Sequence, residues 1–339
     1  MYPVVPPDVL RFQPEIGGPA DWSVSPIELP LQCPDGEPGR FYVLYPDRVP
    51  AGPMPAAVLF HSGSFDYVYA PEPGAPLEGT HFAEPSRLDS EWAVHQVFVT
   101  LGMYPEQDAT ESHDGRLAVA LAEAGVAVLL PSNCWGDLWA DQPGAVDNEF
   151  GADLFSRQGR AAAEWSWQLL ADPTFGPLFD VQLPFTPDPT SLYAIGLGEG
   201  GRAVMELSSI DHDADGAPDY AIAGAVVDSP PDDLRVYFDD AGLFASTVEG
   251  LSRIFPAGPA QAESGSAWAA PLPDRFGYLY STGDPRLPTE LNEAAVERLT
   301  AAGAWVDASE DVRHVRVNGG ADPALAERVV QFLTTGATR

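Results

Sequence analysis

The stretch SLYAIGLGEGGRAVMEL, residues 191–207, decides the fold. Its first half is an apolar run typical of a buried parallel strand, and its second half has the apolar spacing of a helix. Between the halves, Gly196 and Gly200 flank a central Gly198. Glycine tolerates the positive φ and the close backbone approach that a sharp turn requires. The stretch therefore predicts a strand, a tight turn and a helix in immediate succession.

Strand and helix patterns alternate on both sides of this stretch. Two polar-apolar runs near the N-terminus, residues 25–32 and 41–45, enclose the turn-forming CPDGEPGR and predict a β-hairpin. Further along, continuous apolar runs predict buried strands, and they alternate with segments of helical spacing. The last strand is predicted at VRHVRV, residues 312–317, before a closing helix. This alternation predicts an α/β fold with a doubly wound, mostly parallel sheet and a site at the strands' carboxyl ends.

Four segments then resemble the α/β-hydrolase fold, close to its dienelactone-hydrolase and esterase branch. They resemble the oxyanion-loop strand, the following helix–strand unit, the nucleophile turn, and the late strand, acid and helix. In chain order they are VLFHSGS, LAEAGVAVLLPSNCWGD, YAIGLGEGGRAVMEL and GYLYSTGDPRLPTELNEAAVERLTAAG. The resemblance covers most of the chain except an N-terminal arm and an insertion.

The resemblance implies a catalytic triad, and the chain departs from it. Relatives carry G-x-S-x-G at the turn, with the serine as nucleophile, whereas Gly198 stands in the serine's place. Asp284 follows its strand as the triad acid does. With His314 assigned to the last strand, the base position falls at Ala321 or a neighbour, and no histidine lies within 315–339. The resemblance therefore implies a catalytically degenerate, non-hydrolytic member.

Such a protein is expected to keep a pocket for a small ligand or a protein partner. The residues expected to line it are His61, Ser62, Gly63, Gly198, Glu199 and Asp284. A first alternative is an active hydrolase of ester bonds, in which His61, Ser64 and Asp284 form a rearranged site.

A second alternative is a nicotinamide-dependent oxidoreductase. Gly196, Gly198 and Gly201 satisfy G-x-G-x-x-G between a strand and a helix, and Asp228 ends the next strand. That fingerprint usually opens its domain, whereas here several strand–helix units precede it. No organic cofactor is expected.

Two regions flank or interrupt the regular pattern. Residues 1–25 are proline-rich and predict an extended arm, and residues 26–339 predict one hydrolase-like domain. Within it, residues 65–113 lose the regular alternation, apart from a short helix expected near 90–101. Long irregular insertions of this kind are typical of lids and binding loops.

The segment DHDADGAPD predicts a structural calcium site. It is a D-x-D-x-D-G-x-x-D pattern, in which alternate carboxylates converge on a hard cation and the glycine allows a sharp turn. It resembles the calcium loops of extracellular repeats. The expected ligands are Asp211, Asp213, Asp215, the Ala217 carbonyl and Asp219.

Charge and composition exclude several partners. The chain has 50 acidic and 17 basic residues, for a formal net charge of −33. All 17 basic residues are arginines. Such a surface repels nucleic acid and anionic lipid, and no apolar run is long enough to span a bilayer. Together with the calcium pattern, this favours a secreted or periplasmic protein whose leader is absent, with a cytoplasmic location as the alternative. Cys33 and Cys134 are compatible with one disulfide or with two thiols.

Overall fold

A single nine-stranded sheet runs through the part of the chain that the structure describes. The structure is a computed structural model. It describes residues 9–14, 17–32, 38–61, 97–103, 114–131, 157–208, 210–212, 215, 217–230, 272–284, 289–311 and 315–338. The strand order is β1-β2-β3-β5-β4-β6-β7-β8-β9, so the chain crosses over between strands that are not consecutive.

The sheet has an antiparallel side and a parallel side. The antiparallel strands are β1 (Leu10–Arg11), β2 (Trp22–Gln32) and β3 (Pro38–Pro46). The parallel strands are β4 (Met54–Phe60), β5 (Ala127–Pro131), β6 (Pro187–Leu197), β7 (Gly224–Asp228), β8 (Phe276–Ser281) and β9 (Trp305–Ser309). The predicted hairpin is confirmed as the antiparallel pair β2–β3, and β3 pairs antiparallel with β5. β1 and the start of β2 belong to the predicted N-terminal arm, part of which is therefore paired in the sheet.

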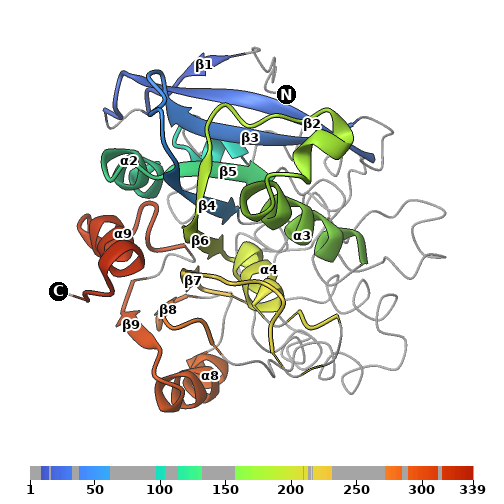
Figure 1. Cartoon of the computed structure of the whole chain (residues 1–339). Coiled ribbons are helices and arrows are strands. Elements are labelled where there is room, and N and C mark those ends of the chain that lie inside the picture. Colours follow the sequence, from blue (N-terminus) through green and yellow to red (C-terminus); the bar gives the residue numbers. More distant parts are fainter. Residues whose placement is uncertain are drawn as a thin grey trace, which may run out of the picture.

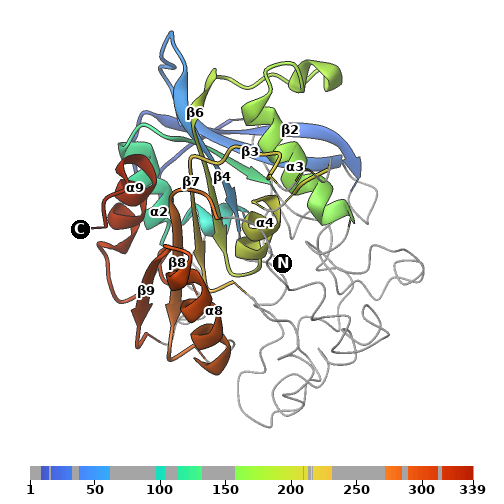
Figure 2. The ribbon, with the colours of Figure 1, turned by 60° about the horizontal axis from the view of Figure 1, so that its bottom comes forward.

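Helices cover both faces of the parallel strands (Figure 1). The helices are α2 (Arg116–Glu123), α3 (Arg157–Ala171), α4 (Glu199–Leu207), α8 (Thr289–Ala301), α9 (Leu325–Thr335) and the short 3₁₀ helix η5 (Gly176–Phe179). α2 packs against α9 on one face, and α3 packs against α4 on the other. Figure 2 shows α8 beside β8 on the same side of the sheet as α4.

Burial on two faces explains the apolar runs in the sequence. Every residue of β5, β7 and β8 is buried, so these strands do not alternate between apolar and polar side chains. The fold class predicted from the sequence, a doubly wound and mostly parallel sheet, is confirmed. None of the helices in the described part of the chain is long and apolar enough to cross a membrane.

The prediction of a strand at residues 312–317 is wrong at residues 315–317, and residues 312–314 lie outside the described part of the chain. The last strand among the described residues is β9, which pairs parallel with β8 from Trp305 to Ser309. Residues 315 and 316 have no regular secondary structure and residues 317–319 form a turn, although Val315 and Val317 are buried. A buried turn and a strand both alternate apolar and polar residues over so short a stretch, which is why the pattern was ambiguous. His314 lies outside the described residues, and in sequence it follows the end of β9 by five positions, before α9.

Part of the predicted insertion belongs to the hydrophobic core. The helical residues 97–100 are buried, and the Phe98 ring lies 5.1 Å from the Tyr42 ring, centroid to centroid. The chain after this helix crosses the start of α2 at two glycines of positive φ. A Cβ on Gly102 would lie 2.7 Å from the Asp114 carbonyl, and one on Gly115 would lie 2.4 Å from the Leu101 oxygen. The remaining insertion residues, 65–96 and 104–113, lie outside the described part.

Candidate functional site

The sharp turn predicted from residues 191–207 is present. β6 ends at Leu197 and α4 begins at Glu199, so Gly198 alone forms the turn, with φ 52°. The Gly198 amide donates to the Asp228 carbonyl oxygen at 2.8 Å, and the Gly201 amide donates to the Gly198 oxygen at 2.9 Å. The backbone of this turn, called the elbow below (residues 196–201), is held from β7 and by its own helix.

The glycines that flank Gly198 are required by packing. A Cβ on Gly196 would lie 2.3 Å from the Gly200 oxygen, and a Cβ on Gly200 would lie 2.3 Å from the Phe60 oxygen. These neighbours are backbone atoms, which cannot move aside as a side chain can. α4 therefore packs directly on the ends of β6 and β4, as the close approach expected from the glycine pattern requires.

Two of the predicted site residues lie at the carboxyl ends of parallel strands. His61 follows β4 and is buried, and its carbonyl oxygen would lie 2.6 Å from a Cβ on Gly200. Asp284 follows β8 and is also buried, and its amide donates to the Ser281 oxygen. Ser62, Gly63 and Ser64 lie outside the described residues, and the same is true of the Glu199 side chain. The described residues thus place His61 beside the elbow and Asp284 two strands away.

Asp228 is a buried carboxylate that the sequence reasoning did not assign to this site. It ends β7, next to the elbow, and its side chain is inaccessible to solvent. One carboxylate oxygen accepts hydrogen bonds from the Arg316 amide at 2.7 Å and the Val317 amide at 2.8 Å. The other accepts the Ser229 hydroxyl at 3.1 Å. Asp228 is fully buried and its carboxylate accepts hydrogen bonds from the protein, which does not fit the accessible ribose-binding acid of the oxidoreductase alternative.

Ser229 adds backbone strain at the same strand end. Its φ is 53°, which is rare for a residue with a side chain, and it is fully buried. The next residue, Pro230, packs against α4, where a Cβ on Gly201 would lie 2.8 Å from the Pro230 Cβ. Strained residues of this kind concentrate at functional sites. The contact with Pro230 explains why residue 201 is a glycine, so this glycine is not evidence for dinucleotide binding.

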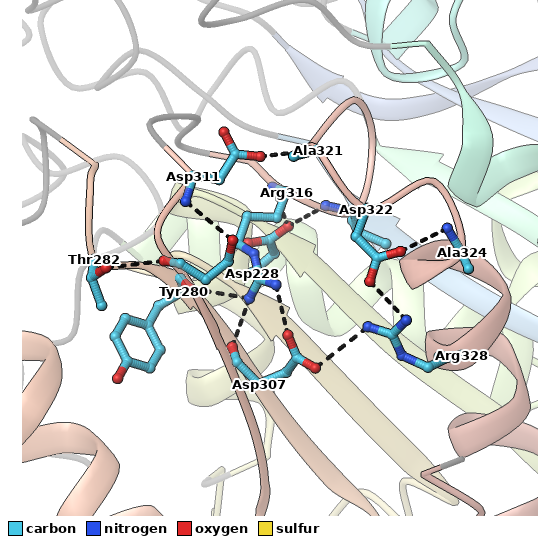
Figure 3. Close-up of polar contacts among 12 residues, drawn as sticks. Asp228, Tyr280, Thr282, Asp307, Asp311, Arg316, Ala321, Asp322, Ala324 and Arg328 are labelled. Atoms are coloured by element: carbon cyan, nitrogen blue, oxygen red, sulfur yellow. Dashed lines mark hydrogen bonds and ion pairs between the residues drawn. The ribbon is translucent and has the colours of Figure 1, made fainter.

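The segment between β9 and α9 is called the β9–α9 connection below (residues 310–324), and the Arg316 side chain attaches it to the sheet (Figure 3). Its guanidinium donates to the Tyr280 carbonyl at 3.0 Å and to the Asp307 carbonyl at 2.7 Å, and it pairs with the Asp307 carboxylate at 2.6 Å. Arg328 of α9 pairs with the same carboxylate at 3.5 Å and with Asp322 at 2.7 Å. The network joins β8, β9 and α9 beneath the connection.

The pKa of the Asp322 carboxylate is shifted by this network. Burial raises its pKa, but hydrogen bonds from Arg328 and from the Ala324 amide, with the charge of Arg328, outweigh burial and leave the pKa below its ordinary value. Asp322 therefore stays ionised in moderately acidic solution, and its pair with Arg328 persists there.

Asn318 fixes the same connection on the side of α2. Its side-chain oxygen accepts the Leu117 amide at 3.2 Å, and its side-chain amide donates to the Thr100 carbonyl at 2.7 Å. Arg116 donates to the Gly320 carbonyl at 3.1 Å. The segment 315–320 is thus held from β7, β8, β9, α2 and the helix at 97–100. No pattern in the sequence predicts these long-range contacts.

Carboxylates accept three hydrogen bonds among the described residues of the predicted calcium loop. Asp211 accepts the Asp215 amide at 3.2 Å, Asp215 accepts the Ala217 amide at 2.8 Å, and Asp219 accepts the His212 amide at 2.8 Å. Asp213 lies outside the described residues. Among the described residues no group of three or more histidine, cysteine, aspartate or glutamate side chains is arranged to hold a metal ion. The calcium site stays a prediction.

The same loop is attached to α3. A ring nitrogen of His212 lies 3.2 Å from the Glu164 carboxylate, and the Tyr220 hydroxyl donates to that carboxylate at 3.3 Å. Gln168 donates to the Tyr220 hydroxyl at 3.2 Å. Burial, with a smaller effect of the Glu164 charge, raises the pKa of Tyr220 to about 12.

Comparisons with known proteins identify the fold. No protein-family model and no curated protein sequence matches the chain. Among solved structures, esterase B from Lactobacillus rhamnosis superposes with a TM-score of 0.55 at 14% identity, over 94% of this chain and 87% of that one. An esterase from Pyrobaculum calidifontis gives 0.52 at 18% identity, over 93% and 84%. Oligopeptidase B from Leishmania major gives 0.52 at 13% identity, over 94% of this chain but only 38% of that one.

These matches, together with the sheet order and the elbow, define the class. The chain has the α/β-hydrolase fold, as its sequence resemblance implied. Within that fold, Gly198 occupies the turn after β6, and Asp284 follows β8.

Proposed function

We propose that this chain binds a ligand at the elbow without hydrolysing it. The observation that carries the proposal is Gly198, which forms the turn alone and has no side-chain oxygen to attack a carbonyl. Removing the nucleophile of a serine hydrolase leaves only the weak residual rate that binding and the oxyanion hole supply. The ligand class we propose is an ester or another small acyl compound, because the solved structures that the chain resembles include esterases.

The retained packing supports a site under structural constraint. Gly196 and Gly200 still allow backbone-to-backbone contact around the turn, and neither could gain a Cβ without displacing the strand ends. Asp284 is still buried at the end of β8. The close backbone packing therefore keeps the turn in place beside the strand ends, where the proposed ligand would bind.

The first experiment measures hydrolysis. The wild-type chain is incubated with p-nitrophenyl esters of several chain lengths and with a fluorophosphonate probe. We expect no turnover above buffer and no covalent labelling, and saturable binding of p-nitrophenyl butyrate by tryptophan fluorescence. Binding should be lost in Gly200→Ala, which displaces the turn, and kept in Gly125→Ala, whose Cβ would meet no atom within 4 Å.

Robust turnover would instead favour the rearranged hydrolase. The observation that favours this second candidate is His61, which is buried after β4 and whose backbone carbonyl lies against Gly200 of the elbow. In that case His61→Ala or Ser64→Ala should abolish the activity. Saturable nicotinamide binding would favour the oxidoreductase.

We also propose that the protein works outside the cytoplasm. The acidic composition, with a formal net charge of −33, and the calcium-type loop support this location. Fractionation of native cells followed by immunoblotting tests it, and recovery only in the cytosol would contradict it.

A further inference from the structure

We infer that Asp228 is a positioning residue that holds the elbow and the β9–α9 connection in fixed relation to each other. The inference rests on the proposed function only in treating these two segments as two sides of one site. Asp228 contacts the elbow through its backbone and the connection through its side chain, so a single residue spans both.

The backbone contact sets the position of the turn. Asp228 is the last residue of β7 and lies opposite Leu197 in the parallel pairing with β6. Its carbonyl oxygen accepts the Gly198 amide at 2.8 Å. The amide at the tip of the elbow is therefore directed toward β7. Any shift of the Asp228 backbone moves Gly198 with it.

The side-chain contact sets the position of the connection. The Asp228 carboxylate accepts the Arg316 and Val317 amides at 2.7 and 2.8 Å. Asp228 and the two donating residues, Arg316 and Val317, are at most 3% exposed, so water does not compete for these bonds. Hydrogen bonds to a charged, buried acceptor are stronger than neutral ones, and a buried donor left without its acceptor is costly.

The carboxylate is itself held in orientation. The Ser229 hydroxyl donates to its second oxygen at 3.1 Å, and the Ser229 amide donates to the Leu279 carbonyl of β8 at 2.8 Å. The positive φ of Ser229, 53°, turns the chain so that both contacts form. The Ser229 hydroxyl thus helps to hold the carboxylate in its orientation toward the connection.

The role of Asp228 is that of a hydrogen-bond acceptor. The Arg316 guanidinium donates to Tyr280 and Asp307, whereas Asp228 receives the backbone amides. Asparagine in place of Asp228 keeps one oxygen for the two amides, and its NH₂ group can donate to the Ser229 hydroxyl. Alanine keeps neither acceptor. The two substitutions therefore separate loss of the acceptor from loss of the charge.

The test is amide hydrogen exchange measured by mass spectrometry on the full chain. In Asp228→Ala we expect peptides covering the elbow and residues 315–318 to exchange at least tenfold faster than in wild type. In Asp228→Asn both should stay within threefold of wild type. The control is Asp188→Ala, because Asp188 also accepts a backbone amide, that of Thr190 at 2.9 Å, but lies at the other end of β6. It should leave both peptides unchanged.

Two results would overturn the inference. One is an Asp228→Ala protein whose residues 315–318 loosen while the elbow keeps its wild-type protection. The other is an Asp228→Asn protein as unprotected as the alanine variant. If the alanine variant does not fold, wild-type exchange in increasing denaturant decides. The Gly198, Arg316 and Val317 amides must then open together, and independent opening overturns the inference. Fluorophosphonate labelling of wild type would contradict the proposed function without changing any of these exchange rates.

Discussion

At the scale of single residues, the most informative one is Gly198. A serine at φ 52° is strained, and hydrolases accept that strain because the turn projects the nucleophile. Glycine adopts the same φ without a steric penalty. The turn here keeps the geometry of a nucleophile elbow while its central residue carries no side chain.

The corrected strand assignment bears on the residue expected to act as base. Since β9 ends at Ser309, His314 follows the last strand in sequence, which is where relatives carry their histidine. We therefore predict that Gly198→Ser gains labelling by a fluorophosphonate that wild type lacks. The positive φ should cost about 1 kcal/mol of stability, measured by chemical denaturation.

The double variant Gly198→Ser, His314→Ala is the control for this gain. It should lose the labelling if His314 acts as base. If the Gly198→Ser protein folds but no phosphonate labels it, the base is missing as well as the nucleophile. That result would agree with the prediction that places His314 inside a strand.

Tyr220 gives a prediction of pH dependence. Its pKa is raised to about 12 in the folded chain, from an ordinary value of 10.0. A raised pKa stabilises the folded state below pH 10, and this contribution is lost as the pH rises from 10 to 12. Solvent screening at this half-buried side chain limits the loss to about 1 kcal/mol.

The measurement compares urea unfolding at pH 9 and pH 11.5 in wild type and Tyr220→Phe. The stability of wild type should fall more steeply than that of the variant. Equal slopes in the two proteins would contradict the assignment. At pH 9 the variant should be about 1 kcal/mol less stable, because it loses the hydrogen bonds to Gln168 and Glu164.

At the scale of elements, the crossing of residues 97–103 with the start of α2 depends on glycine. Gly115 has φ 69° and no room for a Cβ, whereas Gly125, after α2, has φ 72° and no atom within 4 Å of its Cβ position. An alanine at either position would have an unfavourable positive φ, but only at position 115 would its Cβ clash with neighbouring atoms.

We predict that Gly125→Ala costs about 1 kcal/mol and Gly115→Ala about 3 kcal/mol or more. Urea unfolding of the two variants at neutral pH measures the difference. Equal losses would mean that the helix at 97–100 is not fixed against α2 as its contacts imply.

The calcium loop is a second element with a testable property. A site of modest affinity, with a Kd of about 10⁻⁴ M, would gain about 2.7 kcal/mol at 10 mM calcium. We predict that calcium raises the melting temperature by a few degrees above NaCl of matched ionic strength. EDTA should reverse the rise.

The matched variant is Asp211→Asn, which keeps an oxygen to accept the Asp215 amide but removes one charge from the loop. It should weaken the calcium response with little effect on stability in EDTA. No melting shift on adding calcium to wild type would exclude the site.

The elements also illustrate what the sequence could predict. The central strands are buried on both faces, so their apolar runs identified them, and the glycines of the elbow located the turn. The prediction misplaced the end of the sheet because residues 315–317 alternate like a strand, while the amides of Arg316 and Val317 bind Asp228 rather than a neighbouring strand. Short alternating runs carry no information about the partner of each amide.

At the scale of the whole molecule, the site depends on contacts that join distant parts of the chain. The positions of Gly198 and Asp284 after their strands could be predicted from the sequence, because the strands follow one another in a recognisable order. The roles of Asp228, Ser229 and Asn318 could not, because they lie in hydrogen bonds to residues far away in the sequence. Neither residue type nor spacing distinguishes such an aspartate from one that ends an ordinary strand.

Asn318 has a consequence for how the protein is made. Its side chain binds the Thr100 carbonyl and the Leu117 amide, which precede it by 218 and 201 positions. A ribosome must therefore synthesise 201 further residues after Leu117 before those two groups meet their partner. The early strands emerge long before that, with their carboxyl ends unsupported. Chains cut short before α9 should thus depend on chaperones and be preferred targets of proteases, however well their first strands have paired.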